Sequence, residues 1–239
     1  MFQTDSLSLI VLFVGLSLLP FVAMVATSYL KIVVVMSLIR NALGIQSIPP
    51  NMVVNALAMI LTFYIMAPVA SQSWNIITEE RAKFAATRQA AQPASGGQTA
   101  AAGQDGTSVL FESDIAAKAA EPFRVWLSDH TAARERAFFI STAETLWGKE
   151  GEPAVVDPDS FYILLPSFCV SELTKSFQIG FLVYLPFIAI DIIVSNILLA
   201  MGMMMVSPVT ISLPFKLLLF VMVNGWTLLI QGLVRGYAI

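Results

Sequence analysis

The chain has 239 residues, of which 57% are hydrophobic and only 12% are charged, and its formal net charge is −3. Soluble domains carry about 25% charged residues, so this composition leaves too little polar surface for a globule in water. The charges are also concentrated, because 13 acidic and 8 basic residues lie between Glu79 and Asp159. The composition therefore indicates an all-α integral membrane protein with one polar segment between two apolar regions.

Several classes of function are excluded by residues that the sequence lacks. It contains no basic cluster, so we expect no nucleic-acid partner. Cys169 is the single cysteine and His130 the single histidine, which excludes a disulfide framework, a multi-cysteine metal site and a histidine-based triad in the apolar regions. Phosphate-loop, zinc-peptidase and hydrolase motifs are also missing. We expect neither an enzyme nor a cofactor.

Four apolar stretches are each long enough to cross a bilayer, which takes about 20 residues. The first runs from Ser6 to Ile39 with Lys31 as its one charge, and we expect Pro20 to kink it. It is preceded by MFQTD, which lacks the positive region of a secretory signal peptide, so we expect this stretch to be retained. The other three stretches are Met52–Ala70, Phe177–Val206 and Leu217–Val234.

The polar segment lies between the second and third apolar stretches. Within it, Gln89–Gly106 is a low-complexity sequence that we expect to be a disordered insert. Two amphipathic helices are predicted after it, one over about 112–127 and one that follows Asp129 as N-cap and ends at Gly148. The predicted organisation is an N-terminal hydrophobic region (1–78), a polar segment that we expect to be periplasmic (79–166) and a C-terminal hydrophobic helical hairpin (167–239).

The orientation of this arrangement follows from two basic residues. Lys31 and Arg40 flank the first short loop, which the positive-inside rule places in the cytoplasm. The long polar segment is then extracytoplasmic.

Asp191 is the only charge inside the third apolar stretch, where ionisable groups have functional or assembly roles by default. If the turn lies near Val206, Asp191 is about 15 residues, or roughly 22 Å, away from it. Lys216 lies close to the turn, so we expect Asp191 to lie level with Thr227 and to find its charge partner in another subunit. A proton relay and a neutral, locally hydrogen-bonded carboxyl group are the alternatives. Small and polar residues share its helix face: Gly180, Tyr184, Ser195 and Gly202.

Glu172 and Lys175 lie one helical turn apart where the third stretch begins. One interpretation is a solvated helix end with a weak ion pair. The other is an interface with another subunit.

Methionines are concentrated after the third stretch, where Met203, Met204 and Met205 are consecutive. Gly202 and Pro208 on either side favour a helix break there. Methionine side chains are flexible and adapt to irregular neighbours, so the run either fills a core or forms an adaptable contact surface.

The sequence also resembles a known family. The stretch from Phe177 to Leu229 (FQIGFLVYLPFIAIDIIVSNILLAMGMMMVSPVTISLPFKLLLFVMVNGWTLL) resembles the FliP/SctR family of type III secretion export-apparatus proteins. The stretch from Ser28 to Thr62 and the motif AEPFRVWL are similar to the same family. The resemblance covers nearly everything except the predicted insert. Flagellar members carry a cleavable signal peptide, so its absence here favours the injectisome branch.

The resemblance implies a structural subunit of the bacterial inner membrane. Five copies would assemble with one SctT-like subunit, several SctS-like subunits and an SctU-like subunit into a funnel through which unfolded proteins are secreted. It also implies that much of this funnel lies at or above the periplasmic face, within or beside membrane lipid. The family's methionine gasket maps onto Met203, Met204 and Met205. From their positions in or beside the apolar stretches, and not from the resemblance, we expect Asp191, Glu172, Lys175 and Lys216 to be buried polar or assembly residues.

A competing hypothesis is a secondary transporter or ion-channel subunit that uses Asp191 as its coupling site. The two halves of the chain, however, contain no matching pair of interrupted helices.

Overall fold

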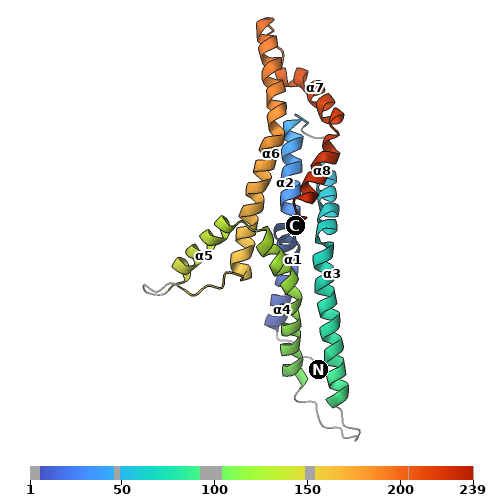
Figure 1. The fold of residues 1–239 in the computed structure, drawn as a ribbon, viewed down its shortest axis with the longest axis vertical. Coiled ribbons are helices and arrows are strands. Elements are labelled where there is room, and N and C mark those ends of the chain that lie inside the picture. The colour runs from blue at the N-terminus through green and yellow to red at the C-terminus, as the bar shows by residue number, and fades with distance from the viewer. Residues whose placement is uncertain (1–5, 46–48, 92–103, 149–153, 204, 239) are drawn as a thin grey trace.

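A computed structural model describes residues 6–45, 49–91, 104–148, 154–203 and 205–238. Figure 1 shows an elongated arrangement of helices, with α6 along one half, α3 along the other and α2 between them. The helices in the described ranges are α1 (Ser6–Val25), α2 (Tyr29–Ala42), α3 (Asn51–Ala91), α4 (Gln104–His130), α5 (Ala133–Trp147), α6 (Phe161–Ala200), α7 (Pro208–Met222) and α8 (Gly225–Arg235).

Helix α2 forms the centre of the larger apolar core. Its apolar residues Ile32, Val35, Met36 and Ile39 recur at helical spacing and are buried. They pack with side chains of α3, α6, α7 and α8. The approach to α6 is close, because a Cβ atom added to Gly180 would lie 2.3 Å from Cδ1 of Leu38.

The first apolar stretch is broken into two helices. Pro20 lies inside α1, whereas the chain bends by 57° between Val25 and Tyr29. The break therefore lies beyond the proline that the sequence analysis expected to cause it.

The polar segment is more helical than its composition suggested. The ends of the predicted insert belong to α3 and α4, and the rest of it, 92–103, lies outside the described residues. Helix α4 continues to His130, and Ala132 is the N-cap of α5, so the prediction of Asp129 as N-cap is wrong. The prediction that this helix stops at Gly148 is confirmed, since Gly148 is its C-cap.

The end of α6 differs from the predicted third stretch. The helix stops at Ala200, and Gly202 adopts a left-handed conformation with φ +73°. The amide groups of Gly202 and Met203 donate to the carbonyl oxygens of Leu199 and Leu198, which closes the helix as a Schellman motif. Helix α7 then begins at Pro208, because the fixed φ of proline suits a first helical position.

The fourth apolar stretch is also two helices. Asn224, with φ +51°, separates α7 from α8, and the two helices meet at 60°. Gly225 lies against the ring of Phe220 at this bend.

The described helices agree with a membrane protein. Two of them, α6 and the 51–86 part of α3, are long and apolar enough to cross a bilayer. The bent pairs α1–α2 and α7–α8 each qualify if they are counted as one span, which gives up to four. The predicted number of spans is therefore reached only when broken helices are included.

Candidate functional site: two buried ion-pair clusters

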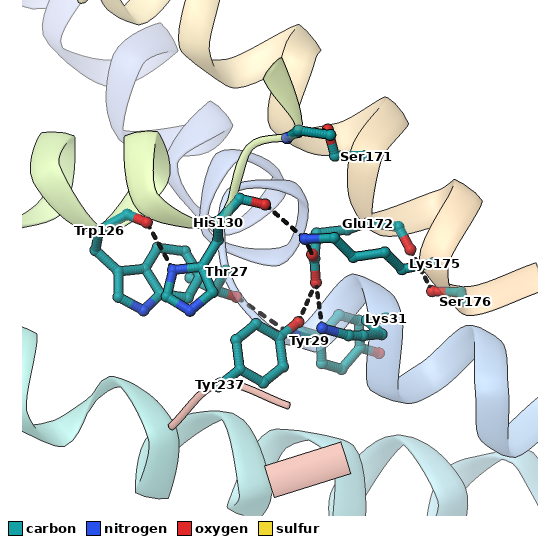
Figure 2. Close-up of polar contacts among 11 residues, drawn as sticks. Thr27, Tyr29, Lys31, Trp126, His130, Ser171, Glu172, Lys175, Ser176 and Tyr237 are labelled. Carbon is teal, nitrogen blue, oxygen red and sulfur yellow. Dashed lines mark hydrogen bonds and ion pairs between the residues drawn. The ribbon is translucent and has the colours of Figure 1, made fainter. Parts of the chain in front are cut away.

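The first cluster surrounds the Glu172 carboxylate, which is completely buried in the middle of α6. Oε2 lies 3.0 Å from Nζ of Lys31 on α2, and Oε1 lies 3.0 Å from Nζ of Lys175 on α6. The hydroxyl group of Tyr237, beyond α8, donates to Oε2. One carboxylate thus holds donors from three separate segments of the chain (Figure 2). We call this set, with Trp126 and His130 described next, the Glu172 cluster.

Aromatic rings of α4 cover the same cluster. The ring of Tyr237 stacks on Trp126 at 6.0 Å and lies 5.3 Å from the ring of His130. Lys31 Nζ lies 3.6 Å from the centre of the Tyr237 ring, within cation–π range. Burial, and then the adjacent Glu172 carboxylate, raise the pKa of the Tyr237 hydroxyl well above its ordinary value. Tyr237 therefore stays protonated and acts as a hydrogen-bond donor.

Lys175 connects the cluster to the end of α4. Its Nζ donates to the carbonyl oxygen of His130, the last residue of that helix, at 2.7 Å. The final carbonyl groups of a helix have no partner within the helix and carry partial negative charge. Nearby, the amide group of Ala132 donates to Ser171 Oγ at 3.0 Å. The start of α5 and the end of α4 are thus both fixed to α6.

The second cluster lies farther along α6, around Asp191. Its Oδ2 lies 2.7 Å from Lys216 Nζ, and Ser212 Oγ donates to Oδ1 at 2.6 Å. Lys216 Nζ also donates to the carbonyl oxygen of Ala42, the last residue of α2, at 3.2 Å. We call Asp191, Ser212 and Lys216 the Asp191 cluster. Lys216 is buried, whereas the Asp191 side chain is 32% exposed.

The expectation that Asp191 has no partner in its own chain is wrong. It assumed a turn near Val206, but α6 stops at Ala200 and α7 starts at Pro208. Asp191 is then about 13 Å from the end of its helix, and Lys216 about 12 Å from the start of the next, at 1.5 Å per residue. The two side chains are therefore level in the hairpin.

The solvated-helix-end interpretation of Glu172 and Lys175 is wrong for Glu172, which is buried inside a continuous helix. The ion pair itself is present. Lys175 is intermediate, with 39% of its side chain exposed.

The methionine loop, residues 201–207, follows the Asp191 cluster beyond the end of α6. Met203 is 43% exposed and Met205 is fully exposed, whereas Met204 lies outside the described residues. The loop connects Gly202 to Pro208, the first residue of α7. Met203 and Met205 therefore lie exposed in the connection between α6 and α7.

Two central residues of the Glu172 cluster, Lys31 and Tyr237, were not predicted from the sequence. Lys31 was counted as a loop-flanking charge, although a lone charge in the Ser6–Ile39 stretch is itself a signal of an internal role. Tyr237 carried no signal, because its position depends on how the end of the chain folds back. Among the described residues, no three His, Cys, Asp or Glu side chains gather in a way that could hold a metal ion.

Comparison with known proteins shows the family of the chain. Residues 12–233 match the FliP family. The chain is 47% identical to Yop proteins translocation protein R of Yersinia pestis over 98% of this chain and 97% of the relative. It is 44% identical to Hypersensitivity response secretion protein HrcR of Ralstonia nicotianae (96% of each chain) and 40% identical to Virulence protein YscR of Salmonella typhimurium (93% of each). The chain therefore belongs to the FliP family, as a membrane component of a type III secretion apparatus of the injectisome type.

Proposed function

We propose that this chain is a core structural subunit of the export gate, lining the pore through which unfolded proteins enter the secretion path across the bacterial inner membrane. The observation that carries the proposal is the exposed methionine loop at the end of the α6–α7 hairpin. Met203 and Met205 are free to meet equivalent side chains of other subunits. The flexible thioether side chains of five subunits can close against one another in a ring and deform around a passing chain.

The Asp191 cluster supports this role by bracing the hairpin that carries the loop. Lys216 joins α7 to α6 through Asp191 and to α2 through the carbonyl oxygen of Ala42. A carboxylate that is already paired with a lysine and a serine favours a structural role over ion coupling, so the transporter or channel hypothesis gains nothing from it.

Assembly is the second part of the proposal. Large apolar side chains remain exposed on α3, α6 and α7, among them Phe63, Phe181 and Phe215. Such surfaces suit membrane lipid and other subunits. We propose five copies around the pore, together with SctT-like, SctS-like and SctU-like subunits.

The proposed topology places segment 79–166 in the periplasm, between hydrophobic regions 1–78 and 167–239. The boundaries at 79 and 166 fall inside α3 and α6, so the three regions are continuous through helices. Lys31 is buried in an ion pair. Under the positive-inside rule, Arg40 alone therefore supports a cytoplasmic position of the first short loop.

The test replaces Met203, Met204 and Met205 together by Ala in the co-expressed complex. We expect the complex to assemble and to conduct ions at rest, measured as current in planar bilayers, because the seal loses most of its volume. Replacement of the three by Leu nearly conserves volume, so closure should be retained while export slows.

Met222→Ala is the matched control, since Met222 is also exposed but lies on α7 outside the loop. It should leave the resting current unchanged. A triple Ala complex that is as tight as wild type would remove the methionines from the seal. Purification of the chain only as a monomer or dimer in the presence of its partners would contradict the assembly.

A further inference from the structure

The last helix is attached to the rest of the protein by one face. Leu229, Leu233 and Tyr237 are its buried residues, spaced four apart, and the positions between them are exposed or half-buried. Tyr237 lies beyond the last residue of α8, but its amide group donates to the carbonyl oxygen of Val234, so the chain continues to turn in the helical sense. The two leucines and the tyrosine therefore form one stripe.

The three contacts of this stripe differ in kind. The leucines join the apolar core around α2, and apolar contacts have no preferred direction. Tyr237 makes directional contacts: its hydroxyl donates to Glu172 of α6, and its ring accepts Lys31 of α2 and stacks on Trp126 of α4. These contacts fix the end of the chain to three helices at once (Figure 2).

The other end of this C-terminal segment is fixed separately. Lys216 joins α7 to Asp191 and Ala42, and between the two attachments the chain bends by 60° at Asn224. The amide group of Asn224 donates to the carbonyl oxygen of Val221, and the carbonyl oxygen of Asn224 accepts from the amide group of Leu228. These bonds end each helix at Asn224 and do not join α7 directly to α8. Across the bend, the rings of Phe220 and Trp226 pack edge to face at 5.3 Å. The direction of α8 is therefore set by side-chain packing at the bend together with the contacts of its far end.

We propose that Tyr237 is an intramolecular clasp, which closes over the Lys31–Glu172 ion pair and thereby fixes the direction of α8 relative to α2, α4 and α6. The clasp is independent of the pore role, since it rests only on contacts within one chain. Tyr237 then positions α8, and the Lys31–Glu172 ion pair also serves as the binding site for Tyr237.

Hydrogen–deuterium exchange of the full-length chain in detergent tests the clasp. Tyr237→Leu keeps an apolar side chain in the stripe but removes both the hydroxyl and the aromatic face. We expect the amide groups of α8 to exchange about tenfold faster or more, the factor that loss of a charged hydrogen bond and a cation–π contact implies. Tyr237→Phe, which keeps the ring over Lys31, should show a smaller acceleration confined to the same helix.

Tyr162→Leu is the matched control, because Tyr162 is the same residue type at an exposed position on α6, and it should leave α8 unchanged. Wild-type protection of α8 in Tyr237→Leu would overturn the clasp, since apolar bulk would then suffice. Acceleration of equal size in α3 and α5 would overturn it as well, because Tyr237 would then be an ordinary core residue. If Tyr237→Leu does not fold, Tyr237→Phe decides: acceleration confined to α8 supports the clasp, and none overturns it.

Discussion

The Glu172 cluster and the Asp191 cluster use the same chemistry in different surroundings. In each, a carboxylate of α6 pairs with a lysine that also binds the last carbonyl group of another helix. Glu172 is fully enclosed and binds donors from α2, α6 and the C-terminal tail, whereas Asp191 is 32% exposed and binds donors from α7 alone. The first cluster joins α2, α6 and the C-terminal residues through one carboxylate, and the second fixes the α6–α7 hairpin and ties it to the end of α2. The Glu172 carboxylate is more completely removed from water than the Asp191 carboxylate. Loss of the Glu172 ion pair should therefore cost more stability than loss of the Asp191 ion pair.

The largest expected effect is at Glu172. Glu172→Ala leaves Lys31 buried without its carboxylate, and removal of one partner from a buried ion pair costs about 3–5 kcal/mol. We expect a large fall in the thermal unfolding midpoint and in purified yield. Glu121→Ala, which breaks an exposed pair with Arg124, is the control and should leave the midpoint nearly unchanged, because water screens an exposed pair. Equal midpoints in the two variants would contradict the enclosed character of the cluster.

A double variant sharpens this result. Lys31→Met with Glu172→Leu removes both charges and fills the space with apolar atoms, which is often neutral or stabilising for a buried pair. The double variant should recover most of the stability lost in Glu172→Ala. No recovery would show that the hydrogen bonds to Tyr237 and Lys175, and not the Lys31 pair, dominate the cluster.

At Asp191 we expect a smaller effect. Asp191→Ala leaves the buried Lys216 with the carbonyl oxygen of Ala42, which should cost about 1–3 kcal/mol and reduce the yield of the assembled complex. Asp191→Asn should be milder, because an amide oxygen still accepts a hydrogen bond from Lys216. Both are measured as complex recovered after co-expression. Normal assembly with loss of proton-dependent export alone would favour a relay instead.

The contact between α2 and α6 lies between the two clusters and can be tested without touching a charge. In Gly180→Ala, the new Cβ atom would lie 2.3 Å from Leu38 Cδ1, and such overpacking costs about 1–3 kcal/mol. Gly232→Ala is the control, because no atom lies within 4 Å of its added Cβ, and alanine is the better helix former. A lower unfolding midpoint is expected for the first variant only. If both variants unfold at the wild-type midpoint, the close approach is easily relieved.

The smallest effect is expected in 92–103, which lies outside the described residues. Replacement of 92–103 by a Gly/Ser linker half as long should change stability by only about 0.6 kcal/mol, the difference in loop-closure entropy. Complex yield and secretion should stay close to wild type. Loss of assembly would show that this segment makes contacts of its own.

The local features of the fold could be predicted from the sequence, because they depend on neighbouring residues. Gly148 as the end of α5 and the apolar helices are examples. The two bends were not predicted, because no proline lies between Val25 and Tyr29 or next to Asn224. The third stretch was predicted to stay helical to about Val206, six residues beyond the end of α6, and this single error separated Asp191 from Lys216.

The Glu172 cluster could not be predicted for a different reason. Its members come from α2, α4, α6 and the tail, and no spacing in the sequence relates Lys31 to Glu172 or either of them to Tyr237. Only the unusual position of each charge in an apolar region was visible. The pairing is a property of the tertiary packing, which periodicity does not encode.

The continuity of α6 has a consequence for where the two carboxylates can lie in a bilayer. Glu172 and Asp191 belong to one unbroken helix, so about 28 Å separates their levels along its axis. The hydrocarbon core of a bilayer is about 30 Å thick. If the helix crosses the bilayer upright, the two carboxylates cannot both lie at the midplane. Either they lie near opposite surfaces of the hydrocarbon layer, or one of them lies outside it. Because the distance between them along α6 is fixed, the position of either carboxylate relative to the lipid determines the position of the other.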